Sequence, residues 1–186
     1  MSGATAGFFT KVGERELYQG HIVNLAIGAF EGPDGERFER EVVHHPGAVA
    51  MVPLVEGGRT VVLVRQYRAA LEELLLELPA GKLDVPGEAP EVAAARELEE
   101  EIGYRAGRLE LVAEFYNSPG FCDERVFVFL ATGLEPAPMS AQGVEETYMT
   151  VEHVALTDAL AMVGDGRIKD AKTIIGLLVA RDRLAA

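Results

Sequence analysis

Three glutamates in the segment 90–102 have the residue type and spacing to bind a divalent cation. On a helix that turns about 100° per residue, Glu97, Glu100 and Glu101 fall on the same side. Glu97 repels the other two, and the nearby helix C-terminus disfavours negative charge, each by about a few tenths of a kcal/mol. A bound cation would remove both costs, and Mg²⁺ prefers carboxylate oxygens. A solvated helix face would more often mix charges of both signs.

The helix that would carry these carboxylates is predicted from residue 90 to residue 102. Pro90 suits the first helical turn, and Gly103 is a suitable C-terminal cap. The stripe predicted to face the core, opposite the glutamates, consists of Val92, Ala95, Leu98 and Ile102. Ala93 and Ala94 are small residues beside the acidic side, so we expect a ligand or a loop to approach closely there.

Residues that bind softer metals do not cluster in the sequence. The four histidines are scattered, and His44 and His45 are neighbours in a predicted strand, where they would point to opposite faces. Cys122 is the single cysteine, so an intramolecular disulfide is excluded. No histidine is near Cys122 in sequence, which makes a small filler residue a better interpretation than a nucleophile.

Strand-like segments outnumber helical ones along the chain. They are 17–30, 37–43, 48–55, 60–67, 108–117, 125–133 and 148–156. Helical patterns occur at 90–102, 157–164 and 170–184. Because strands and helices do not alternate regularly, we expect an α+β chain whose mixed β-sheet is packed between helices. The residues EGPDGE at 31–36 predict a turn, and hence an N-terminal hairpin.

Length and charge narrow the classes of partner. The 186 residues suit one well-packed globular domain, and the formal net charge of −13 opposes binding to nucleic acid or to acidic membranes. An anionic substrate would therefore need a cation to mediate its approach. The N-terminus does not resemble a signal peptide, and no segment has the length and apolarity of a membrane span, so we expect a cytoplasmic protein.

Residues 81–104 resemble the Nudix box. That pattern is Gly, five residues, Glu, seven residues, Arg-Glu, an aliphatic residue, any residue, Glu-Glu, any residue, Gly and an aliphatic residue. After Glu88 and seven residues, the matching positions are Arg96, Glu97, Leu98, Glu100, Glu101 and Gly103. Six residues rather than five separate Gly81 from Glu88, and Tyr104 replaces the last aliphatic residue. The extra residue precedes the helix and leaves the spacing of the carboxylates unchanged.

The resemblance implies a metal site and a role for the arginine. Glu97 and Glu101 would be the principal ligands of Mg²⁺, for which Mn²⁺ could substitute. Glu100 would be a further ligand or would orient one, and the carbonyl of Ala80 would complete the site. Arg96 would orient the carboxylates through charge-assisted hydrogen bonds and is counted among the catalytic residues. Glu88 would be structural and would pair with Arg96.

Other segments resemble the ADP-ribose pyrophosphatase branch of the family, so that the resemblance covers nearly the whole chain. They are REVVHHPGAVAMVPLV, VRQYR, LELPAGKLD and NSPGFCDER. The branch implies hydrolysis of ADP-ribose to AMP and ribose 5-phosphate. The alternatives are another nucleoside diphosphate derivative, such as a nucleotide sugar, or a regulator that binds ADP-ribose without hydrolysing it. The branch also implies a homodimer with exchanged N-terminal strands, with 1–45 as the dimerising region and 46–186 as the catalytic domain.

The same resemblance assigns residues to the substrate. Arg68 would contact the diphosphate or the adjacent ribose, and Ser118 and Glu124 would border the terminal ribose. Arg40 and Glu41 would reach the adenosine part, either of the same ligand or of the ligand in the partner subunit. Each of these residues has an alternative interpretation as an ordinary surface or strand-edge residue.

A glutamate in the long loop 134–148 is expected to activate the attacking water. In the branch this residue precedes the last strands, and Glu145 or Glu146 is the match here. The position of Met149 favours Glu145. A carboxylate pair on a loop is otherwise most often solvated, so both residues stay open as candidates.

Overall fold

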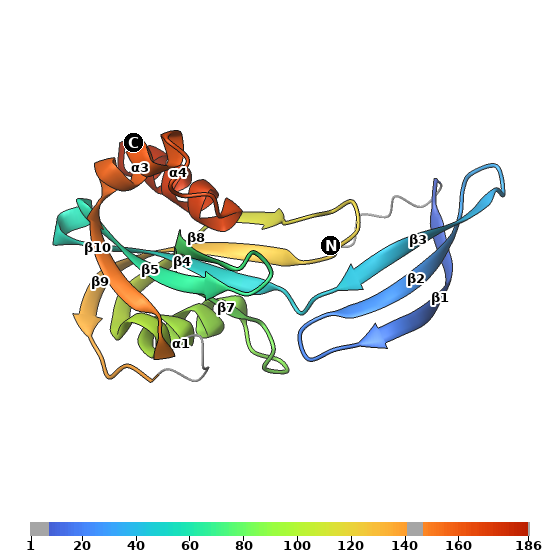
Figure 1. Cartoon of the computed structure of the whole chain (residues 1–186), viewed down its shortest axis with the longest axis horizontal. Helices are drawn as coiled ribbons and strands as arrows, with labels where there is room; N and C mark the ends of the chain where they lie inside the picture. Colours follow the sequence, from blue (N-terminus) through green and yellow to red (C-terminus); the bar gives the residue numbers. More distant parts are fainter. Residues whose placement is uncertain (1–7, 141–146, 186) are drawn as a thin grey trace. The chain divides into compact units, whose positions relative to one another are not determined.

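The computed structural model describes residues 8–140 and 147–185 and divides the chain into two compact units. Unit 1 contains Met1–Gly47 and Tyr116–Arg125, and unit 2 contains Ala48–Phe115 and Val126–Ala186. The first boundary therefore lies two residues beyond the predicted one, and the segment 116–125 belongs to the N-terminal unit. Figure 1 shows the elements of both units. No helix among the described residues is long and apolar enough to cross a membrane.

Unit 1 contains a three-stranded antiparallel sheet. Its strands, in order, are β1 (Thr10–Gln19), β2 (Asn24–Glu31) and β3 (Arg37–His44). The predicted hairpin is confirmed as β2 and β3, with Gly32 N–H donating to Glu36 O across the turn at 2.8 Å. The predicted strand 17–30 is wrong, because the chain reverses after Gln19 and Gly20 N–H donates to Val23 O. Every residue of β1 is exposed, so this strand carries no alternation that a sequence could reveal.

Aromatic side chains cover part of the sheet in unit 1. Phe30 stacks on Phe38 with 5.6 Å between ring centroids, and Phe9 meets Phe38 edge-on at 5.9 Å. The Arg40 guanidinium carbon lies 4.7 Å from the Phe38 ring centroid, a cation–π distance. Ala26 is the one buried hydrophobic residue of β2 that belongs to the core. Small apolar contacts, not an extensive core, therefore stabilise this sheet.

Unit 2 is built on a seven-stranded mixed sheet of order β10-β5-β4-β9-β8, with β6 added to β5 and β7 added to β4. The strands are β4 (Ala48–Val55), β5 (Thr60–Arg68), β6 (Glu73–Glu77), β7 (Ala80–Lys82), β8 (Tyr104–Tyr116), β9 (Arg125–Pro136) and β10 (Thr150–Ala155). A short 3₁₀ turn, η1 (Glu56–Gly58), joins β4 to β5. Strand β4 pairs in parallel with β9 and antiparallel with β5 and β7, which confirms the predicted mixed sheet.

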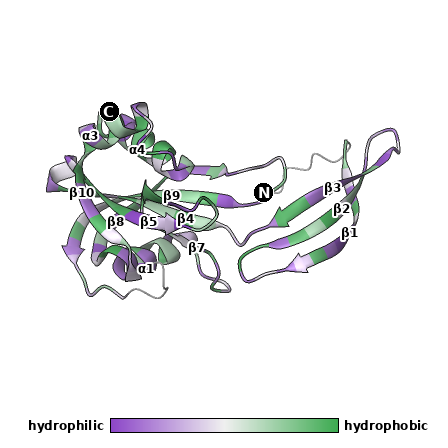
Figure 2. Cartoon of the chain, in the orientation of Figure 1, coloured by the Kyte–Doolittle hydropathy of each residue, from purple (hydrophilic) through white to green (hydrophobic). Residues whose placement is uncertain are grey.

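Helices pack on both faces of this sheet. They are α1 (Pro90–Ile102) on one face, with α3 (Leu156–Gly164) and α4 (Ala171–Ala185) on the other. Strand β4 alternates between the two cores, because Val49 and Met51 pack with residues of α1 while Ala50 and Val52 pack with residues of α3 and α4. Apolar residues recur along β4, β5 and β9 (Figure 2). The predicted α+β class and the helix–sheet–helix layering are confirmed.

Helix α1 turns a different face to the core from the one predicted. Its buried residues are Ala93, Ala94, Leu98, Glu101 and Ile102. Val92 is 57% exposed, so its place in the core-facing stripe is wrong, and Ala95 is only partly buried. Ala93 and Ala94 are fully buried in the core that α1 shares with β4, and not beside an open acidic side as expected. Glu101 was expected opposite the core-facing side of α1, but it lies on the buried side. There its carboxylate accepts a hydrogen bond from the backbone N–H of Ala80 in β7.

Candidate functional site

The acidic helix begins and ends at residues that suit those positions. Ala89 precedes α1 in an extended conformation, and Pro90 fills the first turn, where its missing N–H costs nothing. At the other end Gly103 has φ 67°, and its N–H donates to Glu99 O at 3.1 Å. This left-handed cap favours glycine over every residue with a Cβ. The ends of the helix, and hence the register of its carboxylates, are fixed locally.

Arg96 connects three carboxylates of the acidic motif. Its Nε and Nη2 donate to the two oxygens of Glu88, both at 3.1 Å, which is the pair that the sequence predicts. Nη1 donates to Glu97 at 2.7 Å and to Glu100 at 2.9 Å. The hydrogen bonds to Glu88, followed by the charge of Glu97, hold the pKa of Arg96 well above its usual value despite partial burial. One guanidinium therefore fixes the orientation of three carboxylates.

The fourth carboxylate, Glu101, is buried against β7. It is 4% exposed, and its Oε2 accepts a hydrogen bond from Ala80 N–H at 2.9 Å. The adjacent Gly81 lies against Glu97, because a Cβ built on Gly81 would be 2.0 Å from Glu97 Cδ. Ala80 and Gly81 thus bring the backbone of β7 onto the side of α1 that carries Glu97 and Glu101.

The carboxylates of Glu97 and Glu101 offer only oxygen atoms as metal ligands, which suits a hard cation such as Mg²⁺. Within residues 8–140 and 147–185, no three Asp, Glu, His or Cys side chains are already arranged to hold a metal ion. Mg²⁺ fits the residues nonetheless, since it usually takes one or two carboxylates and completes its shell with water and substrate oxygens. Glu97 and Glu101, with the backbone of Ala80, form such a partial set.

Arg68, at the end of β5, is paired inside the protein. Its Nε and Nη2 donate to the buried Glu77 at 2.7 and 2.6 Å. Those hydrogen bonds are the largest contribution to the raised pKa of Arg68, and the charge of Glu101 adds to it. The guanidinium therefore feels the charge of the acidic helix, and part of it remains exposed.

In unit 1, the loop 117–124 is attached to β3. Val43 N–H donates to Phe121 O at 2.7 Å, and Asp123 N–H donates to Val43 O at 3.1 Å. The side chain of Asp123 adds two contacts, accepting a hydrogen bond from His45 N–H at 2.8 Å and lying 2.5 Å from His44 Nδ1. The backbone and the side chains together fix this loop on the strand that carries Arg40 and Glu41.

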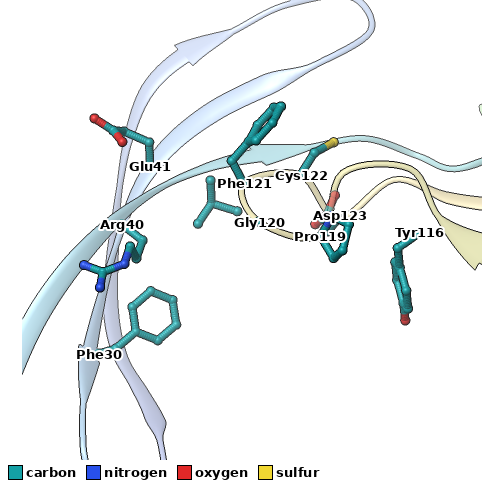
Figure 3. A pocket seen from close by; sticks show the side chains of 10 residues that line it. Phe30, Arg40, Glu41, Tyr116, Pro119, Gly120, Phe121, Cys122 and Asp123 are labelled. Atoms are coloured by element: carbon teal, nitrogen blue, oxygen red, sulfur yellow. The ribbon is translucent and has the colours of Figure 1, made fainter.

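A cavity of about 380 Å³ lies between β3 and this loop (Figure 3). Arg40 and Glu41 line it, as do side chains that include Phe30, Tyr116 and Phe121. Aromatic and apolar walls with a few charged groups are typical of sites that bind a planar organic ligand. Two of the predicted substrate residues are thus brought together at one cavity.

Ser118 and Glu124 lie in the same loop but do not line the cavity. The Ser118 carbonyl accepts hydrogen bonds from Phe121 N–H and Cys122 N–H, which closes a turn. Glu124 accepts a hydrogen bond from Asn117 Nδ2 at 2.8 Å. Both residues therefore shape the loop. The candidate bases Glu145 and Glu146 lie outside the described residues.

Sequence reasoning missed several residues of these sites. Glu77 was not singled out, although an acid in the apolar run LLLELP was a usable signal for a buried partnered charge. The aromatic residues Tyr116 and Phe121 gave no signal beyond their type. The pair between His44 and Asp123 joins residues that are 79 positions apart, so no local pattern could reveal it.

The chain is similar to known proteins over most of its length. The chain is 41% identical over 162 residues to the ADP-ribose pyrophosphatase of Bacillus subtilis (strain 168), covering 87% of this chain and 86% of the relative. It is 39% identical over 162 residues to a methanol dehydrogenase activator of Bacillus methanolicus, with the same coverage. It is also 39% identical over 170 residues to the ADP-ribose pyrophosphatase of Mycobacterium tuberculosis (strain ATCC 25618 / H37Rv), covering 91% and 82%.

A solved structure shares the fold. The crystal structure of an ADP compounds hydrolase superposes with a TM-score of 0.82 at 22% identity, covering 96% of this chain and 95% of the other. The family model described as the NUDIX domain matches residues 44–170, which include the acidic helix and the strand β7 that meets it. The match and the two ADP-ribose pyrophosphatases agree with the resemblance read from the sequence, and the chain belongs to the Nudix family.

Proposed function

We propose that this protein hydrolyses the diphosphate bond of ADP-ribose to AMP and ribose 5-phosphate in the presence of Mg²⁺. The observation that carries the proposal is the acidic helix, where Arg96 orients three carboxylates and β7 meets a fourth. The two relatives named ADP-ribose pyrophosphatase support the choice of substrate, since each is similar to this chain over most of its length. Hydrolysis adds water across one P–O bond and needs no covalent intermediate.

The carboxylates and the backbone of β7 would hold the metal. Glu97 and Glu101 would be its ligands, with the Ala80 carbonyl, while Glu100 would bind it or orient a ligand. When bound, Mg²⁺ would neutralise charge on the diphosphate and lower the pKa of the attacking water. Arg96 would keep the carboxylates oriented whether or not the substrate is present. Mn²⁺ is a possible substitute, because it accepts the same oxygen ligands.

The remaining steps are assigned to other residues of the chain. Glu145 or Glu146 would accept the proton of the attacking water. Arg68 would donate to the diphosphate. In unit 1, the cavity beside Arg40 and Glu41 supports a role for both in binding the adenosine part. Ser118 and Glu124 would act at the terminal ribose through the loop that they shape.

A substrate panel with direct product analysis tests this function. Purified protein with Mg²⁺ is offered ADP-ribose and several nucleotide sugars, and the products are separated by chromatography. We expect AMP and ribose 5-phosphate, with ADP-ribose giving the highest kcat/KM. A higher kcat/KM for a nucleotide sugar would show that the nucleotide sugar, and not ADP-ribose, is the preferred substrate. Measurable ADP-ribose binding without turnover of any diphosphate, in Mg²⁺ or Mn²⁺, would identify a regulator instead.

We also propose a homodimer in which the region 1–45 takes part. The strand β1 is exposed along its whole length, and its exposed residues include the apolar Val12, Leu17 and Tyr18. An exposed apolar strand face is most often covered by another protein surface. Light scattering after size exclusion should give twice the 20.0 kDa of the chain. A monomer at micromolar concentration would exclude the dimer. The cytoplasmic location stays a prediction, which cell fractionation would check.

A further inference from the structure

A buried carboxylate of unit 2 lies between two cations. Glu77, the last residue of β6, is 1% exposed. It accepts two hydrogen bonds from Arg68, at 2.7 and 2.6 Å, and one from Lys172 Nζ at 2.5 Å. Burial alone would raise the pKa of Glu77, but the hydrogen bond from Arg68 and the charge of Lys172 outweigh it and hold the pKa below its usual value. Glu77 is therefore a charged acceptor for both partners.

This pairing leaves one edge of the Arg68 guanidinium available. Nε and Nη2 are used by Glu77, whereas Nη1 has no hydrogen-bond partner among the residues that the structure describes. The Arg68 side chain is 39% exposed, and the charge of Glu101 acts on it. An arginine that is held side-on by a carboxylate, through Nε and Nη2, has little freedom left, so its remaining donors point in one direction. Fixed donors near an acidic metal site suit a phosphate oxygen.

Lys172 is itself held by the start of α4. Its Nζ donates to Asp170 at 3.0 Å as well as to Glu77, and its side chain is 11% exposed. Thr173 N–H donates to the other oxygen of Asp170 at 2.9 Å, and Leu78 N–H donates to Thr173 Oγ1 at 2.8 Å. The backbone beside Glu77 is thus attached to the same helix end as Lys172. This arrangement restricts the Glu77 carboxylate to one orientation.

We propose that Glu77 and Lys172 are positioning residues for substrate, which act through Arg68. Glu77 fixes the guanidinium through Nε and Nη2 and leaves Nη1 for the substrate, and Lys172 fixes Glu77. Neither residue touches the substrate. The inference rests on the proposed function, because it assigns the diphosphate of the substrate as the group that Arg68 binds.

Substitution of Lys172 tests the proposal, with a matched control three residues away. Lys172→Met removes the ammonium group, and Lys169→Met makes the same change at a side chain that is 64% exposed and 3.9 Å from Glu73. For Lys172→Met we expect KM for ADP-ribose to rise about tenfold while kcat changes less than about threefold. Lys172→Arg should return KM to within about twofold of wild type, because it restores the charge. Lys169→Met should leave both constants unchanged.

A residue that merely stabilises the fold would behave differently. Lys172→Met would then lower the midpoint of thermal unfolding without changing KM, and this outcome would overturn the proposal. If Lys172→Met does not fold, the double variant Glu77→Gln/Lys172→Gln replaces the pair by neutral side chains and leaves no buried charge unpaired at these two positions. The same rise in KM is expected for it, and an unchanged KM would again overturn the proposal.

Binding of inorganic pyrophosphate separates this inference from the choice of substrate. Calorimetric titration with pyrophosphate and Mg²⁺ requires neither the nucleoside nor turnover. We expect about tenfold weaker binding to Lys172→Met and wild-type binding to Lys169→Met. If wild-type protein does not hydrolyse ADP-ribose but this difference is seen, the substrate is wrong and the positioning role stands. If ADP-ribose is hydrolysed and both variants bind pyrophosphate like wild type, the positioning role is wrong.

Discussion

The carboxylate of Glu97 occupies the space that a side chain at residue 81 would need. A Cβ built on Gly81 would lie 2.0 Å from Cδ and 2.2 Å from Oε1 of Glu97, and real Cβ atoms do not approach other atoms so closely. The glycine therefore permits the close approach of β7 to α1. This explains why a glycine stands there although six residues, and not five, separate it from Glu88.

Replacing this glycine should disable the proposed metal site and spare the fold. Gly81→Ala forces the Glu97 carboxylate to move, so we expect turnover to fall at least about tenfold and the Mg²⁺ concentration for half-maximal rate to rise. Gly164→Ala is the control, because a Cβ there meets nothing within 4 Å. Rates measured over a range of Mg²⁺ concentrations decide the matter. Wild-type kinetics in Gly81→Ala would show that Glu97 need not lie where the structure places it.

Replacing Glu101 tests whether its negative charge, and not its packing, is needed for activity. Glu101→Gln keeps the side-chain volume and an oxygen that can accept from Ala80 N–H, but it removes the negative charge. We expect kcat to fall by roughly a hundredfold or more, with little change in the thermal midpoint. Glu91→Gln changes an exposed residue in the first turn of the same helix and should be neutral. Nearly full activity in Glu101→Gln would rule out this residue as a metal ligand.

Arg96 is expected to tolerate no replacement, including lysine. A lysine ammonium cannot reproduce the bidentate contact with Glu88 and still reach Glu97 and Glu100. Arg96→Lys should therefore lower kcat/KM by about 10- to 100-fold. Steady-state kinetics in Mg²⁺ would measure the loss. A loss of less than about twofold would mean that the carboxylates orient without this guanidinium.

The identity of the base can be decided by two matched variants. Glu145→Gln and Glu146→Gln change neighbouring residues of the sequence in the same way, so each is the control of the other. If Glu145 accepts the proton, its replacement lowers kcat with little change in substrate affinity, and Glu146→Gln is nearly silent. The reverse result assigns the base to Glu146. Equal and small effects would show that neither residue activates the water.

Unit 1 should lose stability as pH rises, because the pKa of His44 is raised in the folded protein. The hydrogen bond to Asp123, followed by that to Glu14, raises the pKa of His44 above its usual value. A raised pKa means that the folded protein binds the proton more tightly, so the stabilisation is complete below about 6.5, the unfolded value, and disappears as pH rises through the folded value. Denaturant titrations at several pH values should show this fall, and His44→Gln should remove it.

The two carboxylates that contact His44, which belong to Glu14 and Asp123, also make the stability of unit 1 depend on pH in the acid range. The pKa of Glu14 is lowered by its hydrogen bonds, first with Lys11 and then with His44. Burial alone would raise the pKa of Asp123, but contacts with His44 and with His45 N–H lower it. Stabilisation by these carboxylates is present above their unfolded values, near about 4, and is lost as pH falls through the lower folded values. A pH profile of His44→Gln that parallels wild type would contradict both assignments.

In unit 2, the sequence predicts best the strands whose side chains are buried on both faces of the sheet. Strand β4 has the predicted bounds, and β5 is one residue longer than predicted. Strands β6 and β7 were missed, since they are short and have no periodic pattern of their own. Strand β1 was missed for another reason, because all of its side chains are exposed and a partner strand alone defines it.

The candidate site divides in the same way. Contacts within a few residues, such as Arg96 with Glu97 and Glu100, follow from helical spacing and were predictable. The burial of Glu101 was not, because its partner Ala80 N–H is 21 residues away and the helical projection put this residue on the wrong side. Glu77 and Lys172 are 95 residues apart, and only the packing of α4 near β6 brings them together.

The attachment of residues 117–124 to β3 has a consequence for synthesis of the chain. Val43 and His44 leave the ribosome long before their partners, and Asp123 follows His44 by 79 residues. A nascent chain shorter than this has the three strands of the N-terminal sheet but neither the loop nor the cavity wall that the loop supplies. The N-terminal sheet therefore gains this loop only after helix α1 has emerged, which leaves its strand edges open to misassembly during that interval.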